Sequence, residues 1–503
     1  MTRLSDKTYP AILLALAMLG AWWALRDMVL PHDVGWQFWT ARQMLGGTEL
    51  YAEIWEVNPP LWFWSAMPLA WVAEQTGAPW GAVLAGAVAG LGALCAGLTA
   101  HLLGPRSAME RAVWGLLVFA MTVILPASQT GQREPLALIV SLPYAALIAR
   151  RHAGVAVPGL LAAGVALLAA YGFALKHYFV AVPLVLELWL IARQRGAWRP
   201  WRPEVAVLAG LAAAYAAAVV VLTPAFFSVI LPMVEAAYFS SQATLVFTLV
   251  KPYVLFWVVA GGFLWATRKL PLRAVSPAAE AAIPALVLTW GAFALGYVLQ
   301  SRGWNYHSIA ATGTMGVAVG LRAWRVEAWP ARAIGGAMLA ALVWLMYPYN
   351  PRPAPEEPLL DRVAPGEGVF IADFNAGAIW RRGREDLVWV SRAYSLWMVQ
   401  AITAAEAEGR VTPALARLRG EVLAATSQDI RCHPPQLILF KATPGTRGAD
   451  GAFSFEAFLL RDPALREFLA AHYGPAERAK AGTAYWRRGT AAGLAASACR
   501  TIR

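Results

Sequence analysis

Charged residues are scarce in this sequence. Only 14% of its 503 residues are Asp, Glu, Lys or Arg, whereas 59% are hydrophobic and 24 are Trp. A soluble chain of this length would carry more charge, so the composition indicates a helical membrane protein with several spans. The basic residues that give the net charge of +12 are dispersed between apolar segments, so we expect no nucleic-acid partner.

The common signatures of soluble enzymes are also missing. There is no phosphate-binding glycine loop, no HExxH motif, and no cysteine or histidine cluster with zinc spacing. No nucleophile elbow is present, although a Ser-His-Asp arrangement stays open. Of only three cysteines, Cys95 falls in a hydrophobic segment, whereas Cys432 and Cys499 could pair if their part of the chain is periplasmic.

Long apolar runs are what the sequence does contain. They predict about eleven transmembrane helices, the first being a retained anchor. The predicted spans are 12–30, 80–103, 112–126, 136–149, 155–174, 178–192, 205–222, 252–267, 281–299, 308–321 and 333–347. The run at 59–73 is short for a span and opens with Pro59 and Pro60, so we expect a juxtamembrane helix there, lying on the membrane surface.

The distribution of basic residues predicts the orientation. One alternating set of loops holds about sixteen Lys and Arg residues, against about six in the other set. The richer set should be cytoplasmic, which places the N-terminus inside the cell and the C-terminal part in the periplasm. We therefore expect a multi-pass protein of the bacterial inner membrane.

The composition shifts sharply near residue 347. Before it, Ala, Leu, Val and Trp dominate, and after a Pro-rich linker at 348–358 the chain resembles a soluble domain. Strands are predicted at 368–374, 386–392, 435–441 and 484–488, with helices at 412–426, 454–461 and 462–474. We predict a transmembrane domain at 1–347 and a small α/β domain at 348–503.

Acidic and basic residues gather on the loops that this topology places outside. A carboxylate can take a proton from an acceptor hydroxyl, and cations can stabilise a departing phosphate. Together they suit glycosyl transfer from a lipid-phosphate sugar with inversion at the anomeric carbon. The residues concerned are Asp33, Glu53, Glu56, Asn58, Arg133, Glu134, Lys176, His177, Arg302, Tyr306 and His307.

The first loop carries a resemblance to a known family. Asp33 after the first span, ARQMLGGTELY, and then Asn58-Pro59-Pro60-Leu61 resemble the C-type (GT-C) membrane glycosyltransferases, whose relatives include protein mannosyltransferases and lipid A aminoarabinose transferases. Glu134-Pro135 stands where that family carries a second acid. The sequence departs from the family pattern at Val34, where many relatives have an acid, and at Glu134, where they have Asp.

The resemblance implies a polyprenyl-phosphate sugar as donor and a lipid, glycan or protein as acceptor. It assigns Asp33 as the catalytic base and Glu134 as its assistant. Arg302 and Lys176 are our expected phosphate ligands. We expect the remaining polar residues to bind substrate: Glu53, Glu56, Asn58, Arg133, His177, Tyr306 and His307.

Simpler interpretations remain for each of these residues. Asp33 could cap a helix, Glu134 could pair with Arg133, and Lys176 could reach toward the membrane interface. The acidic loop could hold a divalent cation, but no ligand set is specific enough to assert one. Alternative functions are a transporter or flippase, or a polymerase or ligase, of lipid-linked saccharides.

Overall fold

The computed structural model describes residues 2–238, 244–346, 357–374, 386–448, 451–479, 482–491 and 499. The chain divides into two compact units. The first unit contains Met1–Met28, Ala78–Ala218 and Ala243–Arg352, and the second contains Val29–Gly77, Val219–Gln242 and Pro353–Arg503. The predicted boundary between residues 347 and 348 lies outside the described residues and stays a prediction.

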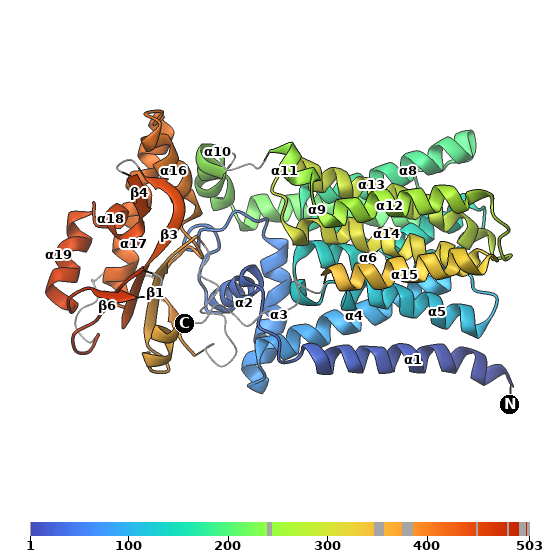
Figure 1. The fold of residues 1–503 in the computed structure, drawn as a ribbon, viewed down its shortest axis with the longest axis horizontal. Helices are drawn as coiled ribbons and strands as arrows, with labels where there is room; N and C mark the ends of the chain where they lie inside the picture. Colours follow the sequence, from blue (N-terminus) through green and yellow to red (C-terminus); the bar gives the residue numbers. More distant parts are fainter. Residues whose placement is uncertain are drawn as a thin grey trace. The chain divides into compact units, whose positions relative to one another are not determined.

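The first unit is a bundle of helices that run alongside one another (Figure 1). Its helices are α1 (Thr2–Leu25), α4 (Trp80–Leu102), α5 (Ala108–Phe119), α6 (Arg133–His152), α7 (Gly159–Ala174), α8 (Ala181–Gln194), α9 (Pro203–Leu222), α11 (Leu245–Leu249), α12 (Pro252–Ala266), α13 (Pro277–Gln300), α14 (Asn305–Arg325) and α15 (Trp329–Met346). Apart from the short α11, each of these helices overlaps one of the predicted spans.

Five of these helices, α1, α4, α9, α13 and α15, are long and apolar enough to cross a membrane. This is the character expected of a helical membrane protein. For the other six helices that overlap a predicted span, crossing stays a prediction. The first span was predicted to reach residue 30, but α1 ends at Leu25, just before the polar pair Arg26 and Asp27.

Helices α6 and α14 form the core of the first unit, because both are buried along most of their length. Glycines allow this close packing. A Cβ atom at Gly313 would lie 2.4 Å from Leu138, and one at Gly172 would lie 2.3 Å from Val140. Small residues at helix contacts are typical of membrane bundles, where backbones must approach closely.

The second unit begins with α2 (His32–Leu45) and α3 (Leu61–Thr76), which pack on each other. Helix α3 lies at the predicted juxtamembrane segment, with Pro60 as its N-cap residue. A further segment forms the π turn η5 (Phe226–Ile230) and α10 (Leu231–Ala237). Met233 and Ala237 of α10 are buried in the core of this unit.

A six-stranded mixed sheet forms the rest of the second unit. Its strands are β1 (Gly368–Ala372), β2 (Val388–Trp389), β3 (Leu437–Gly448), β4 (Gly451–Ser454), β5 (Glu477–Ala479) and β6 (Gly482–Trp486). They are ordered β2-β1-β3-β6-β5, and β4 pairs with β3. Strands β2, β1 and β3 are parallel, whereas β6 is antiparallel to both β3 and β5.

Helices provide the crossover that the parallel strands require. Between β2 and β3 lie α16 (Trp397–Ala407) and α17 (Pro413–Cys432), and α18 (Phe455–Leu459) and α19 (Pro463–His472) follow β4. The predicted strands and helices of this region overlap β1, β2, β3, β6, α17, α18 and α19. Helix α16 and the short strands β4 and β5 were not predicted.

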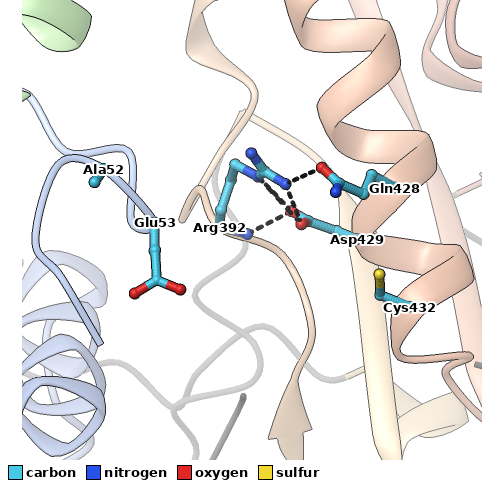
Figure 2. A pocket seen from close by; sticks show the side chains of 6 residues that line it. All are labelled: Ala52, Glu53, Arg392, Gln428, Asp429 and Cys432. Atoms are coloured by element: carbon cyan, nitrogen blue, oxygen red, sulfur yellow. Dashed lines mark hydrogen bonds and ion pairs between the residues drawn. The ribbon is translucent and has the colours of Figure 1, made fainter. Parts of the chain in front are cut away.

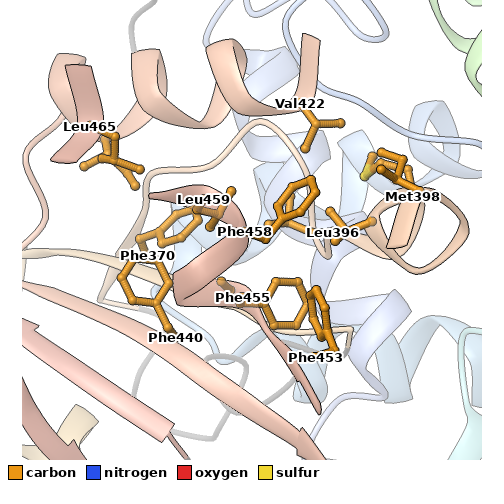
Figure 3. Close-up of a cluster of buried hydrophobic side chains, with 14 of the residues drawn as sticks. Phe370, Leu396, Met398, Val422, Phe440, Phe453, Phe455, Phe458, Leu459 and Leu465 are labelled. Atoms are coloured by element: carbon orange, nitrogen blue, oxygen red, sulfur yellow. The ribbon is translucent and has the colours of Figure 1, made fainter. Parts of the chain in front are cut away.

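The core of the second unit is aromatic, as Figure 3 shows. Phe370 of β1 and Phe440 of β3 face Phe455, Phe458 and Leu459, and all five side chains are buried. Burying one such side chain stabilises a fold by about 1.5–3 kcal/mol. Residues 369–372 and 437–440 of these strands are continuous apolar runs, as expected for strands at the centre of a sheet that is covered on both faces.

A disulfide joins Cys432, the last residue of α17, to Cys499. The bond closes a loop with a sequence separation of 67 residues.

Removing the disulfide should destabilise the protein. Because closing a loop of this size removes entropy from the unfolded chain, we expect C432S/C499S to lose about 4 kcal/mol of stability. Thermal unfolding of the purified protein measures the loss. C95A, at the buried free cysteine, is the matched control, and an unchanged melting temperature after reduction would contradict the expectation.

Candidate functional site

The first unit contains a buried ion pair between two residues that the sequence singled out separately. Glu134 lies in the first turn of α6, and Lys176 precedes the short 3-10 turn η3 (His177–Val180). Lys176 Nζ lies 2.5 Å from Glu134 Oε1 and donates a second hydrogen bond, of 2.7 Å, to Gln300 Oε1. Both side chains are buried. Burial of two such charges is tolerated because each compensates the other.

His307 completes this cluster. It lies in the first turn of α14, and its Nε2 atom is 3.8 Å from Glu134 Oε1. The charges of Lys176, Arg133 and Arg302 all act on its ring. The structure thus brings together five predicted site residues from four separate stretches of the chain, and we call them the cationic cluster: Arg133, Glu134, Lys176, Arg302 and His307.

Aromatic rings pack around the cationic cluster. The Lys176 ammonium lies 5.7 Å from the centre of the Tyr306 ring, and the Arg302 guanidinium lies 5.7 Å from the Trp304 ring. Tyr306 also meets His307 edge-to-face at 4.3 Å. Such contacts hold cations in place at low cost in hydration. Trp304 is 47% exposed, which suits the interfacial anchor that its sequence position suggests.

The cluster contains buried polar atoms that form no hydrogen bond within the part of the chain that the structure describes, among them Glu134 Oε2 and His307 Nδ1. Buried polar atoms are nearly always paired, so such atoms are available to a ligand. With three cations beside one carboxylate, the cluster suits a ligand that carries negative charge and hydroxyl groups.

His177 does not join the cluster. Its side chain is exposed, and its ring packs on that of Tyr178 at 3.9 Å. Partial desolvation of the ring and the charge of Lys176 lower the pKa of His177. Its predicted substrate-binding role stays a prediction.

Asp33 lies in the second unit, in the first turn of α2. Its N-cap residue is Pro31, so Asp33 is not the helix cap. His32 Nδ1 lies 2.6 Å from Asp33 Oδ1, and the Asp33 side chain is 21% exposed. The His32 ring stacks on Tyr394, with ring centres 5.6 Å apart. Asp33 is therefore a partly buried carboxylate beside an imidazole, an arrangement that can exchange protons.

Glu56 and Asn58, both predicted to bind substrate, are bonded to each other. Glu56 accepts hydrogen bonds from the Asn58 side chain at 2.6 Å and from the Asn58 backbone at 2.8 Å. Its other oxygen accepts from Trp36 Nε1 at 2.7 Å. The Asn58 carbonyl accepts from the Tyr51 hydroxyl. These bonds fix the turn before α3, which is a structural role for both residues.

Glu53 lines a pocket of about 160 Å³ in the second unit. Opposite it, Arg392 is held by Asp429, with Nη2 2.8 Å from Oδ1, and donates to Gln428 at 2.9 Å (Figure 2). The Glu53 carboxylate accepts a hydrogen bond from the Glu49 backbone at 2.8 Å. The pocket combines acidic, basic and amide groups, a set that suits hydroxyl-rich ligands.

The residues that sequence reasoning missed are Gln300, Arg392, Tyr394 and Asp429. No local sequence motif identifies these residues, because each contacts a partner that lies far away in the sequence. Asp373 follows β1, and Lys441 Nζ lies 4.0 Å from its carboxylate.

No metal ligand set is evident among the residues that the structure describes, since no group of three or more His, Cys, Asp or Glu side chains could hold an ion. The predicted acidic-loop cation therefore gains no support from Glu53 and Glu56. Comparison with models of known protein families found no match, and comparison with curated proteins found none either.

Proposed function

We propose that this protein is an inverting membrane glycosyltransferase that uses a polyprenyl-phosphate sugar as donor. The observation that carries the proposal is the cationic cluster, in which residues chosen one by one from the sequence converge. Lys176 and Arg302 would bind the donor phosphate, and their charge would stabilise it as it departs. Glu134 keeps the Lys176 side chain in place and offers its second oxygen to a sugar or acceptor hydroxyl.

Asp33 would act as the general base. Inverting transfer needs a carboxylate that takes the proton of the acceptor hydroxyl while that oxygen attacks the anomeric carbon. Partial burial and the neighbouring His32 are consistent with this role. The acceptor would be a lipid, glycan or protein hydroxyl, and the pocket beside Glu53 suits a hydroxyl-rich one.

The proposed topology resembles that of the GT-C enzymes. It has about eleven spans, periplasmic juxtamembrane helices and a periplasmic C-terminal α/β domain. The disulfide between Cys432 and Cys499 supports this placement, because disulfides persist in oxidising compartments. The excess of basic residues in the other loops supports it independently.

Purified protein in liposomes tests the proposal. We would supply polyprenyl-phosphate sugars with candidate lipid, glycan and protein acceptors, and measure free polyprenyl phosphate together with glycosylated product. The proposal predicts that the two appear in equal amounts.

Donor that crosses the bilayer unchanged would contradict the proposal and indicate the second candidate function, a transporter of lipid-linked saccharides. The buried Glu134–Lys176 pair favours that second candidate, since ionisable pairs inside membranes also mark transport pathways.

The pH dependence of turnover should report on His32. Burial lowers the pKa of His32, but the adjoining Asp33 carboxylate raises it more, and the pKa ends above 6.5. Protonated His32 pairs with Asp33 and weakens it as a base, so turnover should rise as pH increases through this pKa. Tyr394 stays neutral in this range, because burial and the charges of Asp33 and Asp373 raise its pKa well above 10.

The substitution H32F keeps the ring and removes the ionisable group. We expect H32F to remove the rise in kcat above pH 6.5. The pH dependence that remains should then be the rise in kcat at lower pH, where Asp33 itself loses its proton. Rate measurements from pH 5 to about 9 check this. A pH profile that H32F leaves unchanged would contradict the pairing.

A further inference from the structure

Tyr394 lies just beyond strand β2 and against the first turn of α2. Its ring is nearly parallel to the His32 ring, with an interplanar angle of 8° and centres 5.6 Å apart. It also meets the Trp36 ring, 5.9 Å away and tilted by 44°. A residue that follows strand β2 thus contacts His32 and Trp36, which lie on either side of Asp33 in the sequence of α2.

The first turn of α2 is not fixed by its own sequence. Its N-cap residue, Pro31, has no side-chain group that could accept from the free backbone N–H groups. The orientation of this turn therefore depends on tertiary contacts. Trp36 supplies one of them through its hydrogen bond to Glu56, and Tyr394 supplies another by stacking on His32.

The segment before Tyr394 is itself anchored to the first loop. The backbone N–H of Trp55 donates to the Arg392 carbonyl at 2.7 Å, and Trp55 forms a parallel bridge with Ala393. The Arg392 guanidinium lies 5.4 Å from the Trp55 ring and is held by Asp429. The backbone that carries Tyr394 is therefore attached to the loop between α2 and α3, and this attachment holds Tyr394 against α2.

We propose that Tyr394 is a positioning residue for glycosyl transfer, which orients the Asp33 carboxylate by stacking on His32. The inference rests on the proposed function, in which Asp33 is the base. A proton acceptor must lie within hydrogen-bond reach of the acceptor hydroxyl, and a displacement of about 1 Å can slow a reaction about 100-fold. The stack restrains that displacement, whereas Lys176 and Arg302 bind the donor phosphate.

Replacing Tyr394 by alanine or phenylalanine tests the role. We expect Y394A to lower kcat about 10- to 100-fold with donor KM within about threefold of wild type. Y394F keeps the stacked ring and should recover most of the turnover. F468A is the matched control, because Phe468 is a half-buried aromatic residue of the same unit whose ring contacts are with His472 and Tyr473.

Three results would overturn the positioning role. They are wild-type turnover in Y394A, a loss in Y394F equal to that in Y394A, and an equal loss in the control F468A. If Y394A does not fold, H32A removes the same stack from the helix side and leaves the sheet intact. H32A should also lower kcat more than donor affinity, and an unchanged kcat would overturn the role.

A double-mutant cycle makes the test specific. If His32 and Tyr394 act as one unit, H32A/Y394A should lose no more turnover than the more damaging single variant. Losses that multiply would overturn the proposal. Absence of transfer by the wild type contradicts the proposed function itself, whereas an active wild type, an inactive D33N and an unimpaired Y394A contradict only the role of Tyr394.

Discussion

Replacing Asp33 with asparagine should reduce glycosyl transfer about 1,000-fold. Asparagine has the same shape as aspartate but cannot accept the proton of the acceptor hydroxyl, and general-base catalysis typically contributes 10²–10⁴-fold to a rate. Binding of the donor should change by less than about threefold, because in our account the phosphate is held by Lys176 and Arg302. Transfer assays and calorimetric titration with a non-transferable donor analogue measure the two effects separately.

D27N is the matched control for this substitution. Asp27 lies beyond the end of α1 and forms a half-exposed ion pair with Arg26 at 3.5 Å. Exposed pairs of this kind contribute little to stability, so D27N should behave as wild type. Near-normal turnover by purified D33N would show that Asp33 is not the base.

Replacing Lys176 with methionine should have the second largest effect. The change leaves Glu134 buried without its cation, and breaking a buried pair in this way typically costs about 3–5 kcal/mol. K176M should therefore unfold at a lower temperature and express poorly. The double variant K176M/E134Q removes both charges and should recover most of the lost stability.

Recovered stability should not restore donor binding. A hydrogen bond to a charged group is worth about 1.5–3 kcal/mol, so K176M/E134Q should raise donor KM about 10- to 100-fold. The control is R151M/E204Q, which removes a partly buried pair, joined at 3.0 Å, and should leave donor KM unchanged. Equal donor KM values in the two double variants would contradict phosphate binding by Lys176.

The helices were predictable because their signal is local. Apolar runs of adequate length identify a helix without reference to its neighbours. Each predicted span overlaps a helix of the structure, and five of these helices are long and apolar enough to cross a membrane. The end of α1 was misplaced by five residues, since hydropathy continues through Met28, Val29 and Leu30 after the backbone has left the helix at Leu25. Strands β1 and β3 were predictable for the same reason, because each contains a short continuous run of apolar residues.

Pairings between side chains were less accessible. Glu134 and Lys176 were both selected from sequence, but nothing in the sequence shows that residues 42 positions apart meet through the packing of α6 on α7. Glu56 was expected to bind substrate, and sequence did not show that it bonds to Trp36 and Asn58; its substrate role stays a prediction. Tyr394 carried no motif, because the rings that it contacts lie more than 300 positions earlier in the chain.

A single-turnover reaction followed by NMR tests the central claim most directly. The donor would carry ¹³C at its anomeric carbon, so that carrier release and the configuration of the product are read together. The account predicts one polyprenyl phosphate released for each sugar transferred, with the anomeric configuration inverted. Retained configuration, or product formed without release of the carrier phosphate, would contradict it.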